Sequence, residues 1–296
     1  MLIEKRRRLF NIILFFSLIV LCIVGSYIFV QYVEKNGWGY KRQGLDVYFL
    51  NVGQGDATMF YTKTREVILV DGGPDMSVLY ELGKSLPFYE RTIDLMVLTH
   101  PDSDHLNGLL DVLERYRVKK IMYTDIVDNS DTYTIFKDLV ALEDAEVIIV
   151  KGGENMYIGE LEINVLYPTQ SIQGKSFIDT NESSIALRLS YDSIDFLLTG
   201  DMPQKQEIEL IENNQIVESE IMKAGHHGSK TSSAVEFLYA VNPQYAVISA
   251  GVDNPYGHPH YRVLQNFENI GAHIIRTDEM GTIHAYTNGR EVEISQ

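Results

Sequence analysis

Cysteine is nearly absent from this chain of 296 residues, where it occurs once, as Cys22. A single cysteine excludes a disulfide framework, and it leaves no thiolate for a structural zinc site or a catalytic Cys-His pair elsewhere in the chain. Short repeats and low-complexity tracts are missing too. Because 45% of the residues are hydrophobic, the chain can bury a substantial core. We therefore expect a folded protein whose chemistry rests on oxygen and nitrogen groups.

The chain also lacks an excess of positive charge. Its net charge is −16, and the basic residues that open the chain leave the remainder more acidic still. An acidic domain repels phosphodiester polymers at long range, which counts against nonspecific nucleic-acid binding. A local basic groove or bound cations would offset that repulsion.

The N-terminus combines a basic cluster with an uncharged run. Residues 1–8 contain four basic side chains, and residues 9–33 carry no charge. A helix over this run is long enough to cross a bilayer, and the basic cluster places the N-terminus in the cytoplasm. A core helix and a cleaved signal peptide are the alternatives, but the run exceeds the usual signal length and lacks an Ala-x-Ala-like end. We expect a cytoplasmic segment (1–8), a transmembrane signal anchor (9–33), a linker (34–44) and an extracytoplasmic domain (45–296) on the outer face of the cell membrane.

Four potential metal ligands lie within six consecutive positions, as His100-Pro-Asp102-Ser-Asp104-His105. The apolar run 95–98 before them predicts a buried strand, and helical periodicity follows over 106–116. A loop between strand and helix can turn neighbouring imidazoles and carboxylates toward one point. Such ligand sets suit zinc, manganese or iron. The alternative is a polar turn with two incidental histidines.

Three further predicted strands end in residues of the same kinds. Asp71 follows the run 68–70, Asp201 follows 196–199, and the pair His226-His227 follows 221–224. Ligands gather where loops leave a rigid sheet, so coincidence becomes a weaker explanation. Runs of strands and helices along the domain predict two sheets packed face to face with helices outside. The expected helices span residues 105–116, 132–142, 203–212, 232–240 and 260–270.

The chain resembles the metallo-β-lactamase superfamily of metallohydrolases. The family motif His-x-His-x-Asp-His matches residues 100–105, and other family motifs match Asp71, Asp201 and either His226 or His227. The resemblance is greatest to the hydrolase-like domain of the ComEC DNA-uptake family. That similarity rests on the segments Asn51 to Asp56, Asn181 to Ser184, His226 to Lys230, Tyr256 to His260 and Arg276 to Asp278.

This resemblance implies an α/β fold of the αββα sandwich type and a site for two divalent ions, Zn²⁺ or Mn²⁺. The implied ligands are, for the first ion, His100, Asp102 and Asn181, for the second, Asp104, His105 and His226, and, between the two, Asp201. Asp71, His227 and His260 would support these ligands. Asp102 and Asn181 stand where most of the family has histidine. An oxygen-rich first site would hold its ion weakly and favour manganese.

The expected reaction is hydrolysis of a phosphodiester, with DNA as a possible substrate. Asp104 would orient the attacking water, and His258 would protonate the leaving group or bind phosphate. A structural role in its loop is the alternative for His258. Lys223, Lys230 and Arg188 are candidate phosphate contacts, or solvated surface residues. The alternative functions are a phosphoesterase of cell-envelope polymers (phosphorylcholine or teichoic acid) and a non-catalytic binding protein.

Overall fold

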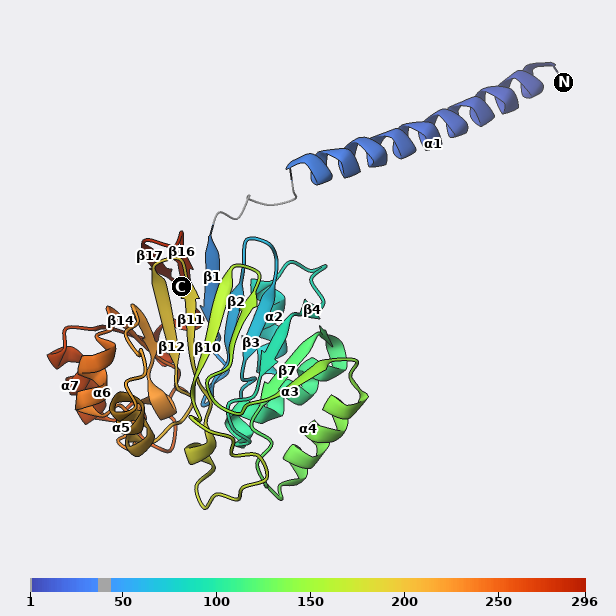
Figure 1. The fold of residues 1–296 in the computed structure, drawn as a ribbon. Helices are drawn as coiled ribbons and strands as arrows, with labels where there is room; N and C mark the ends of the chain where they lie inside the picture. Colours follow the sequence, from blue (N-terminus) through green and yellow to red (C-terminus); the bar gives the residue numbers. More distant parts are fainter. Residues whose placement is uncertain (1, 37–43) are drawn as a thin grey trace. The chain divides into compact units, whose positions relative to one another are not determined.

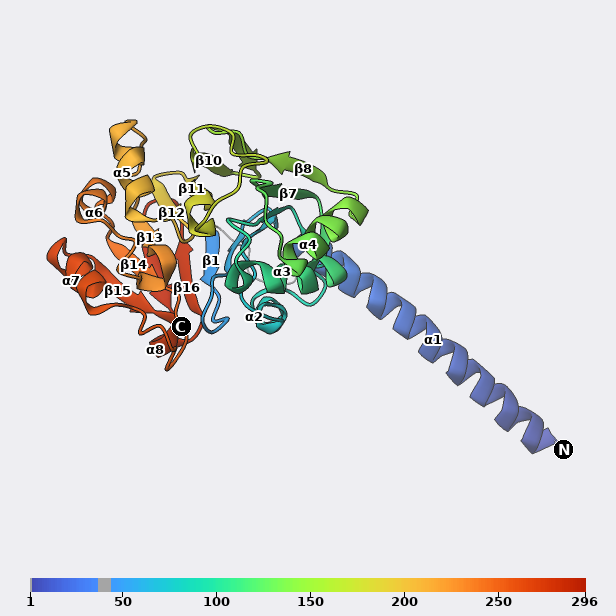
Figure 2. The same ribbon diagram turned by 90° about the horizontal axis from the view of Figure 1, so that it is seen from below.

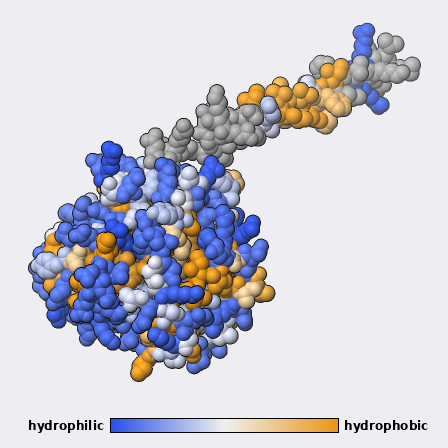
Figure 3. Space-filling view, viewed as in Figure 1, coloured by the Kyte–Doolittle hydropathy of each residue, from blue (hydrophilic) through white to orange (hydrophobic). Residues whose placement is uncertain are grey.

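The structure of the protein is a computed structural model that describes residues 2–36 and 44–296. The chain divides into two units, Met1–Gln43 and Gly44–Gln296. The N-terminal unit contains helix α1 (Leu2–Asn36). Side chains described between residues 13 and 28 are all exposed, and most are hydrophobic (Figure 3).

Among the described residues, no helix meets both the length and the apolarity that a membrane crossing requires. The transmembrane anchor over residues 9–33 therefore stays a prediction. Most of the predicted linker, residues 37–43, lies outside the described residues.

The second unit contains two large β-sheets that face each other, with helices on both outer sides (Figures 1 and 2). The first sheet has eight strands in the order β17 (Val292–Ser295), β16 (Ile283–Thr287), β1 (Leu45–Phe49), β2 (Thr58–Tyr61), β3 (Val67–Val70), β5 (Leu95–Val97), β7 (Lys120–Tyr123) and β8 (Glu146–Ile149). The strands from β3 to β8 are parallel.

The second sheet has seven strands in the order β15 (His273–Arg276), β14 (Tyr245–Ile248), β13 (Ile221–Lys223), β12 (Ile194–Leu198), β11 (Ala186–Tyr191), β10 (Leu161–Tyr167) and β9 (Asn155–Ile158). The strands from β12 to β15 are parallel. A small sheet joins β4 (Thr92–Ile93) and β6 (Arg117–Val118). The helices are α2 (Ser77–Ser85), α3 (Ser103–Arg115), α4 (Asp131–Leu142), α5 (Gln204–Glu212), α6 (Val235–Val241), α7 (Tyr261–Asn269) and α8 (Thr277–Met280), with 3-10 turns η1 (Thr180–Ser183) and η2 (Gly225–Gly228).

Three apolar clusters hold these layers together. The largest lies between the two sheets and includes Phe60 of β2 and Phe196 of β12, whose rings meet edge to face at 5.5 Å. A second cluster joins the first sheet to α2, α3 and α4, and a third joins the second sheet to α5, α6 and α7. The central strand β3 is therefore buried on both faces, as its unbroken apolar sequence requires.

The αββα arrangement confirms the predicted fold class. Helix α3 begins at Ser103, two residues earlier than predicted. Helix α2 and the edge strands β9 and β17 were not predicted from the sequence. The strands β9 and β17 are partly exposed at sheet edges, so their sequences lack the long apolar runs that identify a buried strand.

A buried carboxyl group joins α5 to α6. Glu207 is 0% exposed, and its two oxygens accept hydrogen bonds from the backbone N–H groups of Ser233 (2.8 Å) and Ala234 (2.7 Å), where α6 begins. Burial raises the pKa of Glu207 to about 7, although these two hydrogen bonds oppose the shift. The folded protein therefore binds this proton more tightly than the unfolded chain does.

We expect the free energy of unfolding to fall as the pH rises from the ordinary glutamate pKa of 4.5 to about 7. Protonated Glu207 stabilises the folded protein fully below pH 4.5, and this stabilisation is lost as the pH rises to about 7. It amounts to about 3 kcal/mol. Urea unfolding of the wild type and of Glu207→Gln across this range measures it. The variant should lack this part of the slope, whereas Glu212→Gln, exposed on the same helix, should retain it. Parallel curves for wild type and Glu207→Gln would contradict the assignment.

Candidate metal centre

The candidate ligands come from strand ends of both sheets. Asp71 follows β3, and His100 comes just after β5. Asp201 follows β12, while His226 and His227 form the η2 turn after β13. Because parallel strands of one sheet end at the same edge, these loops meet at one side of the sandwich.

The motif at 100–105 is divided between a loop and a helix. His100 and Asp102 precede α3, whereas Asp104 and His105 lie in its first turn. The prediction that all four ligands share one loop is therefore wrong. A position in the first turn still suits the site, because side chains of a helix tilt toward its N-terminus and so toward the preceding loop.

Asp71 organises both histidines of this motif. It is 2% exposed and accepts hydrogen bonds from Thr99 N (2.8 Å), Thr99 Oγ1 (2.8 Å) and His105 Nδ1 (2.9 Å). Because the only hydroxyl hydrogen of Thr99 points to Asp71, Thr99 Oγ1 must accept from His100 Nδ1 at 3.0 Å. Both imidazoles thus carry hydrogen on Nδ1, and when neutral each has a free lone pair on Nε2.

Two glycines let α3 approach the Asp71 loop. Gly72 N donates to the carbonyl oxygen of His105 at 2.8 Å, and Gly108 N donates to that of Gly73 at 3.0 Å. A Cβ atom on Gly108 would lie 1.9 Å from the carbonyl oxygen of Gly72. No other residue fits at Gly108, so this contact sets the distance between Asp71 and His105.

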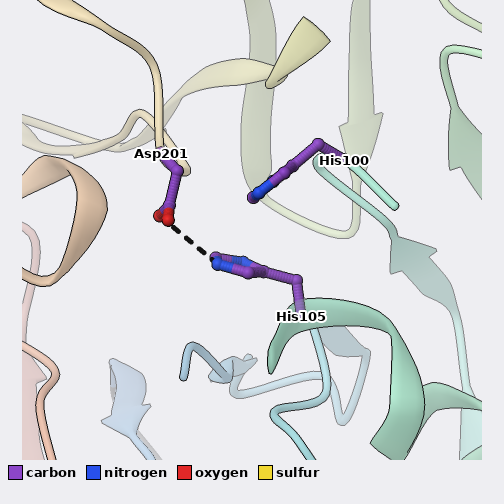
Figure 4. A group of neighbouring side chains, drawn as sticks. All are labelled: His100, His105 and Asp201. Carbon is purple, nitrogen blue, oxygen red and sulfur yellow. Dashed lines mark ion pairs between the residues drawn. The ribbon is translucent and has the colours of Figure 1, made fainter. Parts of the chain in front are cut away.

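Figure 4 shows the side chains of His100, His105 and Asp201 directed toward one another. His105 Nε2 lies 3.3 Å from Asp201 Oδ1 as an ion pair, without hydrogen-bond geometry. These two atoms and His100 Nε2 are all buried without a hydrogen-bond partner. Buried polar atoms are normally satisfied, so three unsatisfied ones that converge indicate a place for a cation.

His227, rather than His226, faces the centre most closely. Its side chain is 1% exposed, and its Nε2 lies 3.2 Å from Asp104 Oδ2 and 3.5 Å from Asp201 Oδ2. His227 Nδ1 is 3.0 Å from the carbonyl oxygen of Ser249. The side chain of His226 is 26% exposed, with Nε2 3.6 Å from Asp201. The geometry favours His227 over His226 as a ligand, and the roles of the two histidines stay predictions.

Both histidines adopt strained backbone conformations. His226 has φ 49° and His227 has φ 54°, in the left-handed region that residues other than glycine rarely occupy. Such strain persists only where surrounding contacts enforce it, and it concentrates at functional sites.

Asp56 is a member of the centre that the predicted ligand set omits. It is 3% exposed, forms an ion pair with Lys223, and its Oδ1 lies 3.2 Å from His227 Nδ1. Lys223 is itself 2% exposed. This buried ion pair contradicts the prediction that Lys223 contacts substrate. The turn from Asn51 to Asp56 was the only sequence signal for Asp56.

Of the two departures from the family pattern, Asp102 lies close to His100. Asp102 Oδ2 is 3.7 Å from His100 Nε2, and its Oδ1 accepts a hydrogen bond from Thr180. Burial raises the pKa of Asp102. Asn181 Oδ1 is buried without a partner. Their roles as ligands stay predictions.

Two predicted residues have structural partners instead. His260 caps α7, where its Nδ1 accepts from Arg262 N at 3.2 Å. Arg188 is ion-paired with Asp195 on the neighbouring strand β12. These contacts argue against the supporting role predicted for His260 and the phosphate contact predicted for Arg188. Lys230 is exposed, as a phosphate contact requires.

His258 lies beside the histidine turn. Its ring centroid is 5.6 Å from that of His226 and 6.4 Å from that of His227. Burial, together with these two neighbours, lowers the pKa of His258 to about 4. The side chain is therefore neutral at pH 7, which argues against the predicted general-acid role and leaves a hydrogen-bonding role open.

Buried carboxylates raise the pKa of two of the three buried histidines, His105 and His227. Burial would lower the pKa of His105, but Asp201 and Asp71 hold it well above its usual value. Burial is likewise outweighed at His227, where carboxylates led by Asp201 raise the pKa to about 9. At His100, burial and the neighbouring His105 lower the pKa to about 4. A bound divalent cation would take the place of the protons that these carboxylates otherwise attract.

Among the described residues, four overlapping groups of side chains have ligand atoms close enough to hold a metal ion. His100, His105 and Asp201 offer ligand atoms within 4.8 Å of one another, and so do Asp104, His105 and His227. The other two groups contain Asp56, which joins Asp201 and His227 in one and Asp71 and His105 in the other. Nitrogen and oxygen donors of this kind suit zinc and manganese. The donor set and its unsatisfied atoms therefore fit the predicted cofactor.

Comparisons with known proteins agree with this description. The model of the Metallo-beta-lactamase superfamily matches residues 50–164. ComE operon protein 3 of Bacillus subtilis is 30% identical over 267 residues, which cover 82% of this chain and 33% of that protein. Competence protein ComA of Neisseria gonorrhoeae is 30% identical over 237 residues, covering 79% of this chain and 31% of that protein. The chain spans about a third of the length of these curated relatives.

Solved structures share the fold. The metallo-beta-lactamase fold protein YhfI from Bacillus subtilis superposes with a TM-score of 0.57 at 12% identity, over 82% of this chain and 100% of that one. Zn(2+)-bound PqqB from Methylobacterium extorquens gives a TM-score of 0.51 at 10% identity, over 78% and 97% of the two chains. At such identities the likeness establishes the fold alone.

The fold is that of the metallo-beta-lactamase type, and the site is a candidate metal centre within it. The chain carries a metallo-beta-lactamase domain, and its curated relatives include ComE operon protein 3 and Competence protein ComA.

We expect Asp71→Asn to weaken metal binding by about 10- to 100-fold. An asparagine presents an amide in place of one acceptor oxygen, so His105 Nδ1 and Thr99 Oγ1 lose the oxygen that they share, and Thr99 no longer orients His100. Competition of Zn²⁺ against a chromophoric chelator measures the affinity. Asp111→Asn, on the same α3 helix where Asp111 pairs with Arg115, is the matched control. Equal affinities for the wild type and Asp71→Asn would contradict this role.

We also expect His227→Ala to lose more metal per chain than His226→Ala. The reason is that His227 Nε2 is buried beside Asp104 and Asp201, whereas His226 approaches only Asp201. Elemental analysis of the two purified variants, after loading with the same excess of Zn²⁺, makes the comparison. A greater loss in His226→Ala would restore the original assignment.

Proposed function

We propose that this protein is a metal-dependent phosphodiesterase that acts on nucleic acid. The observation that carries the metal-dependent part is the convergence of His100 Nε2, His105 Nε2 and Asp201 Oδ1, all buried and without hydrogen-bond partners. The nucleic-acid part is supported by the relatives, among them one named Recombination protein 2 from Haemophilus influenzae, which is 26% identical over 95% of this chain and 32% of that protein.

Divalent cations, when bound, would supply hydroxide at neutral pH and stabilise charge on the phosphate oxygens. The chain's own residues hold the geometry. Asp104 is held by His227, and burial, which would raise the pKa of Asp104, is outweighed by His227 and His105 so that the pKa is lowered. Asp104 is therefore ionised at neutral pH and can accept a hydrogen bond from water.

Two side chains beside the site, Lys230 and His258, can contact the substrate. Lys230 is exposed shortly after the η2 turn, where an ammonium group can meet a phosphate oxygen. His258 is neutral and half-buried beside His226, and its Nδ1 is buried without a hydrogen-bond partner. A substrate phosphate or hydroxyl group can supply that partner.

The proposal includes attachment to the cell membrane through residues 9–33, with the catalytic unit on the outer face. It is supported by the basic cluster before the uncharged run. The run of exposed apolar side chains in α1 also supports it.

We expect the full-length protein, loaded with Mn²⁺ or Zn²⁺, to hydrolyse bis(p-nitrophenyl) phosphate and single-stranded DNA. Asp104→Ala and His105→Ala should lower both activities by about a hundredfold or more, since each removes a candidate ligand and a hydrogen-bonding group of the site. Asp111→Asn, outside the site, should keep both. Metal removal with a chelator should abolish the activity, and restored Mn²⁺ should return it.

Three other results would reject parts of the proposal. A purified protein that holds no transition metal and cleaves nothing with added Mn²⁺ or Zn²⁺ is a binding protein. Turnover of a phosphorylcholine ester alone would assign the enzyme to cell-envelope polymers. Activity of intact cells toward DNA added outside tests the location, and its absence despite activity in lysed cells would reject the outer face.

A further inference from the structure

The loop between β14 and α7 packs directly on the histidine turn. His260 N donates to the carbonyl oxygen of Gly228 at 2.9 Å. Gly228 has φ 78°, and a Cβ atom there would lie 2.6 Å from Cβ of Pro259. Only glycine allows this approach, so the loop and the η2 turn form one unit.

Asn254 fixes the same loop from within. Its Nδ2 donates to the carbonyl oxygens of Gly251 (2.9 Å) and His258 (2.6 Å), and its Oδ1 accepts from His258 N at 3.0 Å. One side chain thus joins both ends of the segment. The residues between them, including Tyr256, are held at a fixed place beside the metal centre.

Three aromatic rings succeed one another from the metal centre outward. His227 and His258 have centroids 6.4 Å apart and planes inclined by 27°. His258 and Tyr256 have centroids 5.8 Å apart and planes inclined by 26°. Tyr256 is 69% exposed, so the outermost ring of this series is open to a further ring.

We propose that Tyr256 is a specificity-determining residue on which a nucleobase of the substrate stacks, next to the phosphodiester at the metal centre. The inference rests on the phosphodiesterase function proposed above and selects its substrate class. Every nucleobase offers an aromatic face, so this contact tolerates any sequence. Polymers of polyol phosphates have no such face.

The charge of the protein strengthens the argument. With a net charge of −16, the chain does not attract a polyanion at long range. Affinity for nucleic acid then needs contacts that do not depend on positive charge, in addition to Lys230 and bound cations. Stacking on a prearranged ring is such a contact, since the ring loses little freedom when the base binds.

The test compares a short oligothymidylate with an abasic phosphodiester chain of the same length. We expect Tyr256→Ala to raise KM for oligothymidylate about tenfold, which corresponds to ~1.4 kcal/mol of lost binding. Tyr256→Phe, which keeps the ring, should behave like the wild type. Tyr157→Ala, which alters a tyrosine of similar exposure (65%) on edge strand β9, should leave KM unchanged. All four proteins should cleave the abasic chain equally well.

Binding without turnover separates the two proposals. Fluorescence anisotropy of labelled oligothymidylate with metal-depleted protein should show the same tenfold weakening in Tyr256→Ala. If the wild type cleaves DNA and Tyr256→Ala matches it in KM and in binding, stacking is rejected and the nuclease function stands. Equal losses on the oligothymidylate and the abasic chain would also reject stacking, since they indicate a displaced loop. Cleavage of a phosphorylcholine ester without cleavage of DNA rejects the nuclease function, and the stacking role with it.

Discussion

The carboxylate of Asp71 is the constraint on which the metal centre depends. Its oxygens accept three hydrogen bonds, one from His105 and two from Thr99, and Thr99 in turn accepts from His100. One buried group therefore sets the hydrogen position on two imidazoles at once. Without that control each histidine could carry hydrogen on Nε2, where it would block a metal ion. The tautomers that leave Nε2 free for a metal ion are thus set by a residue that need not touch the ion.

Close backbone contact between the loop after β3 and helix α3 fixes the position of Asp71. The carbonyl oxygen of Gly72 faces the α carbon of Gly108 so closely that a methyl group there would overlap it. Helix α3 can then begin directly beside the loop after β3, with His105 in its first turn. On the other side of the centre, buried Lys223 neutralises Asp56, which keeps a second carboxylate next to His227 without an unpaired buried charge.

The sequence predicted the parts of this structure that depend on neighbouring residues. The apolar runs that became β3 and β5 were recognisable, and so was the cluster from His100 to His105, because buried strands and ligand-rich loops have local signatures. The role of Lys223 was not predictable in this way. It depends on Asp56, which lies 167 residues away along the chain, and on burial that only the packed sheets create. Edge strands such as β9 also lack a local signature, but for another reason. Because they are partly exposed, polar and apolar residues are both tolerated in them.

The choice between His226 and His227 shows why a motif does not by itself identify a ligand. Adjacent residues in an extended chain point to opposite sides, and either one can face the metal. Here both residues take left-handed conformations, and this turn directs the buried ring of His227 to Asp104 while His226 stays partly exposed near Asp201. Gly228 then admits Pro259 against the turn. The strain at two histidines therefore has two results: it aims one imidazole at the centre, and it creates the surface on which the loop bearing His258 and Tyr256 rests.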